Sequence, residues 1–311
     1  MTRQPERGGL RVLRGSPFAL LQDAGRFGVR HLGVTQGGAL DWISLRWANW
    51  LLGNDLNAAV VEITLGNLSL RCEQDADLAL AGADLAATLD GQALKPWQTF
   101  KVRQGQRLDF NQPVSGARAY LAAPGGFSAT PVLGSRATVA REALGGLHGD
   151  GQPLVDDDCL SWQGKATALR QIAERQIPRF TPAPRLELIM GAQIGDFSGQ
   201  SLFDAFNSDW TIDARADRMG VRLTGPQLHC QRSAMVSEGI PLGAVQVPAD
   251  GQPIILLNDR QTIGGYPRLG ALTPQAVARL AQCLPGETLR FAPAQQHSAQ
   301  QCQRQLLKHW Q

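Results

Sequence analysis

Between residues 60 and 121 the chain is a series of short apolar segments separated by turn residues, which limits the folds open to it. Segments such as VVEITL and NLSLRC have the length and β-branched content of strands, and Asp90-Gly91 and Gln104-Gly105 are typical of tight hairpin turns. Short strands at this regular spacing favour a closed barrel or a sandwich over alternating strand–helix units. The 34 glycines and 18 prolines agree with many short elements, so the sequence predicts a mainly β protein with a few short helices.

The helices are predicted from their caps. Asp41 is a candidate N-cap before an apolar stripe that includes Trp47 and Leu51, and Gly53 is a candidate stop. Thr273-Pro274 predicts the start of another helix, because proline is favoured in the first turn.

The length of 311 residues suits two domains. Residues 177–184 (IPRFTPAP) are proline-rich and extended, so we place the boundary there. The expected division is an N-terminal β-barrel domain over residues 1–180 and a C-terminal β-barrel domain over residues 181–311.

Several classes of function lack support in the sequence. The net charge of +3 implies no nucleic-acid partner. The four lysines lie outside every glycine-rich motif, which argues against a Walker-type phosphate loop and a Schiff base. Serine-hydrolase elbows, HExxH, CxxC and GxGxxG are absent, and no metal site is expected.

The expected location is the cytoplasm. Five widely spaced cysteines are an odd number and read as reduced thiols. Residues 1–9 lack the apolar core of a signal peptide, and no apolar run approaches membrane-spanning length, so no membrane association is expected.

The most site-like stretch is residues 237–270. Two apolar runs, around Val245 and Ile255, are joined by turn residues and lead into a polar and glycine-rich segment that ends at Gly270. Polar side chains carried by a buried strand into a glycine turn are typical of a binding site, although a hairpin with a solvated loop has the same pattern. Gly264 and Gly265 are expected either to adopt conformations closed to other residues or to let the backbone approach a ligand.

Three further candidates lie in the first domain. Asp23 and Arg26 are close enough to pair across a glycine turn, as site residues or as a structural ion pair. Glu62 stands inside an apolar strand and needs a partner if it is buried, for which the Arg26 region is a candidate; the alternative is an outward-facing position. His148 is the most site-like of the five histidines, because the glycines around it leave it accessible, but a lone loop histidine is more often inert.

Six motifs together resemble a known family. They are residues 21–28 (LQDAGRFG), 33–41 (GVTQGGALD), 62–66 (EITLG), 217–223 (DRMGVRL), 237–248 (SEGIPLGAVQVP) and 258–270 (NDRQTIGGYPRLG). The chain resembles the biotin-dependent carboxyltransferase-like family, also called allophanate hydrolase subunit 2. The family turn usually reads QTTGGYP, and here Ile263 replaces the second threonine, which puts a role for that hydroxyl in doubt.

The resemblance implies two cyclophilin-like β-barrel domains. It also implies a subunit of an ATP-dependent enzyme that opens the lactam of 5-oxoproline to glutamate and is active only with B-like and A-like partner subunits. ATP is the expected cosubstrate, and the subunit that binds it is left open. The alternatives are biotin-dependent carboxyl transfer or urea- or allophanate-type amide chemistry, with biotin expected only for carboxyl transfer, and a regulatory module that antagonises a kinase inhibitor.

The expected site contains two groups of residues. Catalytic roles are predicted for Asp259, Arg218 and Tyr266, because an arginine fork can clamp an anion and the other two can orient a substrate. Substrate-binding roles are predicted for a second set: Gln261, Thr262, Gly264, Gly265, Gln246, Glu238, Asp217, Asp23, Arg26 and Glu62.

Overall fold

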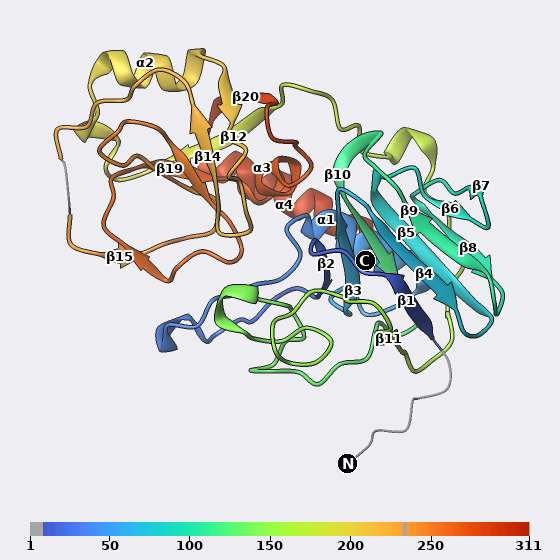
Figure 1. The fold of residues 1–311 in the computed structure, drawn as a ribbon. Coiled ribbons are helices and arrows are strands. Elements are labelled where there is room, and N and C mark those ends of the chain that lie inside the picture. Colours follow the sequence, from blue (N-terminus) through green and yellow to red (C-terminus); the bar gives the residue numbers. More distant parts are fainter. Residues whose placement is uncertain (1–8, 233–234, 311) are drawn as a thin grey trace. The chain divides into compact units, whose positions relative to one another are not determined.

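The computed structural model of this chain describes residues 9–232 and 235–310, and the chain divides into two compact units (Figure 1). The first unit contains Met1–Phe27 and Gly37–Phe180, and the second contains Gly28–Gln36 and Thr181–Gln311. Gly28–Gln36, which falls in the first domain of the predicted division, thus belongs to the second unit by its contacts. Most of the N-terminal start that was compared with a signal peptide, residues 1–8, lies outside the described residues.

The first unit is built from two antiparallel sheets. One has the order β11-β1-β4-β9-β6-β7 and the other the order β2-β3-β10-β5-β8. Their bounds are β1 Leu10–Arg14, β2 Ala19–Gln22, β3 Val60–Thr64, β4 Leu68–Cys72, β5 Ala76–Asp84, β6 Thr88–Leu89, β7 Gln92–Ala93, β8 Gln98–Val102, β9 Arg107–Phe110, β10 Ser115–Ala122 and β11 Cys159–Leu160.

One hydrophobic core joins the two sheets. Alternate residues of strands from both, such as Leu10 and Val12 of β1 and Leu78 and Leu80 of β5, are buried in it. The chain passes between the sheets at sharp turns. Between β3 and β4, the three successive residues from Leu65 to Asn67 all have positive φ (61°, 78° and 60°). This unit is therefore a pair of facing sheets. From the sequence, a β-barrel was expected for this domain.

Helix α1 (Trp42–Leu52) packs on β5 and β10 of the first unit. Its predicted caps are confirmed: the carboxylate of Asp41 accepts hydrogen bonds from the backbone N–H groups of Ile43 (3.1 Å) and Ser44 (3.0 Å). Gly53 ends the helix with φ 70°, where a Cβ atom would lie 2.1 Å from the Thr167 hydroxyl. Short 3₁₀ turns occur at Ala140–Glu142 and Glu174–Gln176.

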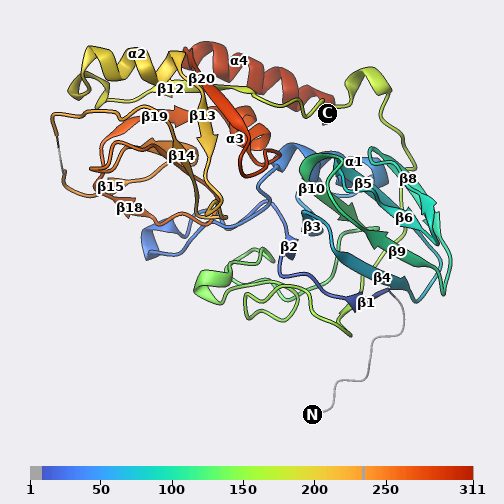
Figure 2. The ribbon, with the colours of Figure 1, turned by 45° about the horizontal axis from the view of Figure 1, so that its top comes forward.

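The second unit contains a closed seven-stranded barrel, β12-β19-β16-β17-β14-β13-β20 (Figure 2). Its pairings are antiparallel except β12 with β20, which run parallel. The bounds are β12 Arg185–Met190, β13 Trp210–Ile212, β14 Gly220–Thr224, β16 Ala244–Gln246, β17 Ile254–Leu256, β19 Arg268–Leu272 and β20 Thr288–Ala294. The mainly β prediction is confirmed, and this unit supplies the predicted barrel.

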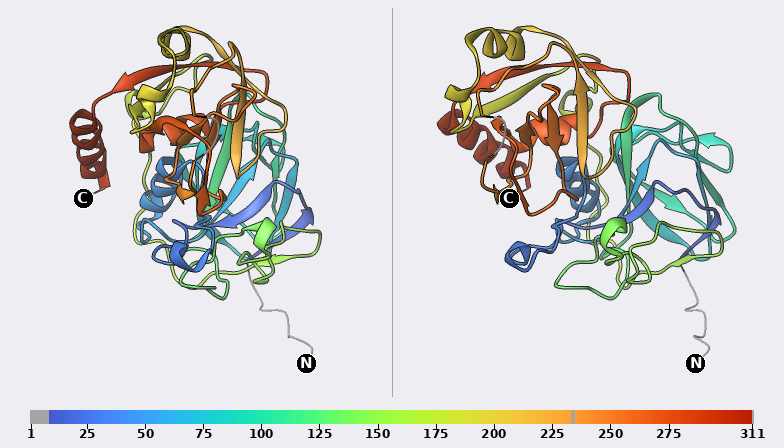
Figure 3. Two further views of the ribbon diagram at one scale, coloured as in Figure 1. Left: turned by 90° about the vertical axis from the view of Figure 1, so that its left-hand side faces the viewer. Right: turned by 60° about the vertical axis from the view of Figure 1, so that its left-hand side comes forward.

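The helices of the second unit lie outside its barrel. Helix α2 (Gly199–Asn207) packs on β20, and α3 (Pro274–Leu280), capped by Thr273 as predicted, packs on β12 and β19. Helix α4 (Gln296–Leu307, red in Figure 3) follows β20. The 3₁₀ turns are Arg30–Leu32, Ile194–Asp196 and Lys308–Trp310. Within residues 9–232 and 235–310, no helix has the length and apolar character needed to span a bilayer.

A two-stranded ribbon completes the second unit. It pairs β15 (Glu238–Gly239) with β18 (Ile263–Gly264), placing Glu238 opposite Gly264. The predicted hairpin is confirmed, since β16 and β17 pair antiparallel around the turn at residues 247–253. The segments before β16 and after β17 thus meet beside the barrel, within the site-like stretch of residues 237–270.

The cap of α1 gives a first prediction. Replacing Asp41 with alanine removes the acceptor of two backbone N–H groups and of the Ser44 hydroxyl, and we expect a loss of about 1–2 kcal/mol in the free energy of unfolding. Asp41→Asn keeps an acceptor at the cap and should lose clearly less. Urea denaturation of both variants checks this, and equal losses would show that the cap is not the stabilising contact.

Candidate functional site

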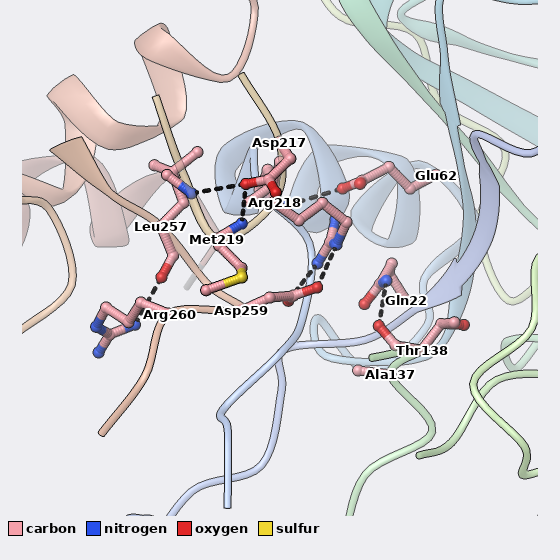
Figure 4. Close-up of polar contacts among 12 residues, drawn as sticks. Gln22, Glu62, Ala137, Thr138, Asp217, Arg218, Met219, Leu257, Asp259 and Arg260 are labelled. Carbon is pink, nitrogen blue, oxygen red and sulfur yellow. Dashed lines mark hydrogen bonds and ion pairs between the residues drawn. The ribbon is translucent and has the colours of Figure 1, made fainter. Parts of the chain in front are cut away.

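Arg218 and Asp259 form a forked ion pair in the second unit (Figure 4). Arg218 donates from Nε to Asp259 Oδ2 (3.0 Å) and from Nη2 to Asp259 Oδ1 (3.2 Å). The backbone brings the residues together, because the N–H of Asp259 donates to the carbonyl of Arg218 and continues the pairing of β14 with β17. Both side chains are largely buried. Arg218 was predicted to clamp an anion, and in the structure the anion that its guanidinium binds is the carboxylate of Asp259.

Asp217 builds the turn that precedes this pair. Its Oδ1 accepts hydrogen bonds from the backbone N–H groups of Met219 (2.8 Å) and Gly220 (3.0 Å). Within the described chain its carboxylate therefore holds the turn that orients Arg218.

Glu238 is an exposed member of the β15–β18 ribbon. Its Oε2 accepts from Arg268 Nη2 (2.5 Å) and from Gln193 Nε2 (3.4 Å). The pairing of Glu238 with Gly264 sets this carboxylate beside the glycine pair.

Gly264 and Gly265 are needed for close packing. Neither has a positive φ, so the expected special backbone conformation is wrong for both. A Cβ atom on Gly264 would lie 2.6 Å from Ile240 Cδ1 and 3.1 Å from Gln246 Nε2, and one on Gly265 would lie 2.7 Å from the Met235 carbonyl oxygen. The alternative expectation was that these glycines let another group approach the backbone closely. The structure shows such an approach, and the approaching groups are Ile240, Gln246 and Met235 of this chain.

Three predicted site residues have side-chain polar groups that remain available. Gln261, Thr262 and Tyr266 make no side-chain hydrogen bond to another part of residues 9–232 and 235–310, and Tyr266 is 48% exposed. They flank the glycine pair on both sides. An amide, a hydroxyl and a phenol at one turn can all donate to a substrate oxygen.

Two arginines that the sequence analysis did not select lie beside this turn. Arg260 is 3% exposed and donates from Nε to the carbonyl of Ile240 (3.1 Å) and from Nη1 to that of Leu257 (3.0 Å, Figure 4). Arg30 donates from Nη2 to the carbonyls of Ile240 (2.8 Å) and Thr262 (3.0 Å). Burial first, and then the charge of Arg30, lower the pKa of Arg260 to about 9, so this guanidinium stays charged at neutral pH. Burial also lowers the pKa of Arg30.

Glu62 of β3 is fully buried in the first unit, so the outward-facing alternative is wrong. Its Oε2 accepts from the Tyr120 hydroxyl (2.8 Å) and from the backbone N–H of Leu40 (2.9 Å). The Tyr120 oxygen in turn accepts from the N–H of Asp41 (2.8 Å). Burial, with the negative charges of Glu62 and Asp41, raises the pKa of Tyr120 well above its ordinary value, so the phenol stays protonated and donates to Glu62.

Asp23 and Arg26 are each held by other groups of the first unit. Asp23 accepts from Gly25 N–H (2.8 Å), the Ser135 hydroxyl (2.6 Å) and Arg136 N–H (2.6 Å). Arg26 donates to the carbonyls of Val132 (3.1 Å) and Ala137 (2.7 Å). The ion pair predicted between Asp23 and Arg26 is wrong for the described residues, because the carboxylate of Asp23 is taken up by a loop more than 100 positions away.

A cavity of about 1210 Å³ lies in the first unit, and none of the predicted site residues of that unit lines it. Its lining includes Phe127, Arg136, His148 and Cys159. His148 Nε2 lies 2.7 Å from Oδ1 of Asp158, so this loop histidine is oriented by a carboxylate. The nearby run Asp156-Asp157-Asp158 could have suggested a carboxylate partner for His148. No local pattern indicates which of the three aspartates contacts the histidine.

The second unit thus offers cationic and neutral hydrogen-bond donors around one glycine turn. Such a set suits the binding of a small oxygen-rich molecule and the stabilisation of negative charge on a carbonyl oxygen.

Comparison with known proteins gives a consistent result. Residues 32–293 match the family described as the carboxyltransferase domain, subdomain A and B. The chain is 38% identical over 284 residues to the C subunit of 5-oxoprolinase from Escherichia coli strain K12, covering 91% of this chain and 90% of that protein. It is 35% identical over 277 residues to the corresponding 5-oxoprolinase protein of Haemophilus influenzae, covering 88% and 87%.

A solved structure shares the fold over almost the whole chain. The urea carboxylase of Kluyveromyces lactis superposes with a TM-score of 0.92 at 25% identity over 99% of this chain. This chain spans only 29% of that much longer protein.

The Arg218–Asp259 pair gives a second prediction. Removing one partner leaves the other charge in a largely buried position, so Asp259→Leu should lower the free energy of unfolding by about 3 kcal/mol. The double variant Arg218→Met/Asp259→Leu should recover much of that loss, because both charges are removed together. The exposed pair Arg215–Asp213 in the same unit is the control, and its removal should change stability little. Additive losses at Arg218 and Asp259 in a double-mutant cycle would contradict the coupling.

Proposed function

Because the chain belongs to the family of carboxyltransferase domains with subdomains A and B, we propose that it is the C-type subunit of a 5-oxoprolinase. In this proposal it acts with B-like and A-like partner subunits to hydrolyse the lactam of 5-oxo-L-proline to L-glutamate, coupled to the cleavage of ATP.

The observation that carries this proposal is the match along the full length of two relatives. Both are subunits named for 5-oxoprolinase, and this chain covers 90% and 87% of them. The urea carboxylase of Kluyveromyces lactis matches only over a part of its chain. The C subunit of 5-oxoprolinase is therefore the better parallel, and a subunit implies partners.

The chemistry explains why ATP is required. A lactam carbonyl is a poor electrophile, and attack by water leaves an amide nitrogen that departs slowly. Transfer of the γ-phosphoryl group of ATP to the carbonyl oxygen forms an imidate phosphate and ADP. Water then adds to the carbon and the ring C–N bond breaks, which opens the ring to an acyl phosphate with a free amine. A second water molecule hydrolyses this acyl phosphate, giving phosphate and glutamate. These steps call for donors around the reacting oxygen more than for a nucleophilic side chain.

The glycine turn of the second unit supplies such donors. Gln261, Thr262 and Tyr266 have side-chain polar groups open to a ligand, and we assign them to the orientation of the lactam. Arg218 and Asp259 form the forked pair on the segment just before that turn, so we assign them to holding the turn in place and to the electrostatics of the site. The proposal leaves ATP binding to the assembled enzyme and places no phosphate loop on this chain.

A second candidate is carboxyl transfer to an amide such as urea. The structural match to urea carboxylase, with a TM-score of 0.92, favours it. That reaction requires a biotin carrier as a partner, so avidin would abolish it, whereas lactam hydrolysis would be insensitive to avidin.

Direct reconstitution tests the proposed function. This chain, its B-like partner and the A-like protein are mixed with 5-oxoproline and ATP, and glutamate and ADP are measured with and without this chain. We expect equal amounts of glutamate and ADP only in the complete mixture, unchanged by avidin. A stable complex without turnover would overturn the substrate and favour the regulatory role; turnover of urea that avidin abolishes would favour carboxyl transfer.

The site assignment gives a third prediction. Tyr266→Phe and Gln261→Ala should each lower kcat/KM for 5-oxoproline by about 10- to 100-fold, because each removes one hydrogen bond to the reacting group. Thermal stability should not change, since neither side chain bonds to another described part of the chain. The matched control is Ile263→Ala, which truncates an apolar side chain that is 59% exposed on the same loop. Wild-type kinetics in both variants, with the complex intact, would remove the turn from the site.

A further inference from the structure

The positive charge of Arg30 and Arg260 is not balanced by a carboxylate among the described residues. Both guanidiniums donate to the same oxygen, the carbonyl of Ile240, so their nitrogen atoms lie within two hydrogen-bond lengths of each other. All their hydrogen bonds within residues 9–232 and 235–310 go to backbone carbonyls. Two adjacent cations, one of them 3% exposed, are unfavourable unless a negative charge joins them.

Two buried hydrogen-bond donors, one on Arg30 and one on Gln246, also have no acceptor among the described residues. Nη1 of Arg30 is buried and has no hydrogen-bond partner among the described residues. The same holds for Nε2 of Gln246, a side chain of β16 that is 2% exposed. Buried donors are normally satisfied, and an unpaired one is unfavourable. The two unpaired donors, Arg30 Nη1 and Gln246 Nε2, therefore indicate a missing hydrogen-bond acceptor by an argument that does not use the charge of the arginines.

The backbone gathers these groups at one crossing, where the segments of Ile240 and Thr262 meet. Ile240 N–H donates to the Thr262 carbonyl (3.0 Å), and Arg30 Nη2 bonds to the carbonyls of both residues. Gly264 is two residues further along, and a Cβ atom there would lie 3.1 Å from Gln246 Nε2. Gly264 therefore packs directly against that amide and against the side chain of Ile240, where a Cβ atom would lie 2.6 Å from Ile240 Cδ1.

We propose that Arg30, Arg260 and Gln246 form a binding site for the carboxylate of the small-molecule substrate. Arg30 Nη1 and Gln246 Nε2 donate to the carboxylate oxygens, and the charge of Arg260 compensates the negative charge without direct contact. This inference rests on the proposed function, because 5-oxoproline carries one carboxylate in addition to its lactam. The open polar groups of Gln261 and Thr262 immediately follow Arg260 in the chain, so a carboxylate at this crossing leaves the lactam ring beside the glycine turn.

A carboxylate fits this site better than a phosphate group. Two free donors match two carboxylate oxygens, whereas a phosphate group presents three oxygens that need partners.

Calorimetric titration of the isolated full-length chain tests the site without turnover. The probes are 5-oxoproline, 2-pyrrolidinone, which has the same lactam ring without the carboxylate, and inorganic phosphate. We expect heat of binding with 5-oxoproline, affinity at least about tenfold weaker for 2-pyrrolidinone, and weak binding of phosphate. Equal affinity for 5-oxoproline and 2-pyrrolidinone, or tight phosphate binding that 5-oxoproline does not displace, would overturn the carboxylate assignment.

Variants separate a binding role from a structural one. Arg30→Gln and Gln246→Leu should each weaken 5-oxoproline binding by about 10- to 100-fold. Gln246→Leu should not lower the melting temperature of the unliganded chain, because it replaces an unpaired buried amide with an apolar group of similar size. The control is Arg290→Gln, which removes an exposed arginine already paired with Asp209. Lower melting temperatures with unchanged affinity would leave Arg30 and Gln246 as structural residues.

The two proposals can fail separately. If the reconstituted enzyme hydrolyses 5-oxoproline with the same KM in the wild type and in Arg30→Gln, the carboxylate site is wrong and the proposed function stands. In another outcome, the wild-type assembly does not turn over 5-oxoproline, the wild-type chain binds it, and the Arg30→Gln and Gln246→Leu variants do not bind it. The site then stands and the proposed reaction is wrong.

Discussion

The guanidinium of Arg260 joins two loops of the second unit from the inside. One of its bonds goes to Leu257, on the segment that leaves β17, and another to Ile240, on the segment that enters β16. Arg30, from the short segment Gly28–Gln36, bonds to the same Ile240 carbonyl and to Thr262. These contacts connect Gly28–Gln36 and both strand-flanking segments to the residue that opens the glycine turn, Thr262.

This arrangement uses charge in an unusual way. Exposed arginines of the second unit such as Arg215 and Arg290 face a carboxylate and are locally neutral. Arg30 and Arg260 face carbonyl oxygens, which satisfy hydrogen bonds without cancelling charge. A site of this kind keeps a positive potential in place before a ligand arrives, and a preorganised potential is what an anionic substrate or a developing oxyanion requires.

Local chemistry explains which features the sequence predicts well. The caps Asp41 and Thr273 and the β16–β17 hairpin follow from the preferences of a few adjacent residues, and the structure confirms them. The partners of Asp23 could not be predicted in this way, because Ser135 and Arg136 are distant in sequence. Arg260 lies within the selected motif, but nothing local shows that a side chain will bond to backbone carbonyls instead of a ligand. The assignment of Gly28–Gln36 to the second unit could not be predicted either, because Arg30 bonds to Ile240 and Thr262, which are more than 200 positions away.

The central claim is that the second unit binds its substrate at the crossing of Ile240 and Thr262. The most direct measurement is a crystal structure of the chain grown with 5-oxoproline. The account predicts ligand density with the carboxylate within hydrogen-bond distance of Arg30 Nη1 and Gln246 Nε2 and with the lactam next to Gln261 and Tyr266. Density for 5-oxoproline in the cavity beside His148, with the crossing unchanged, would contradict it.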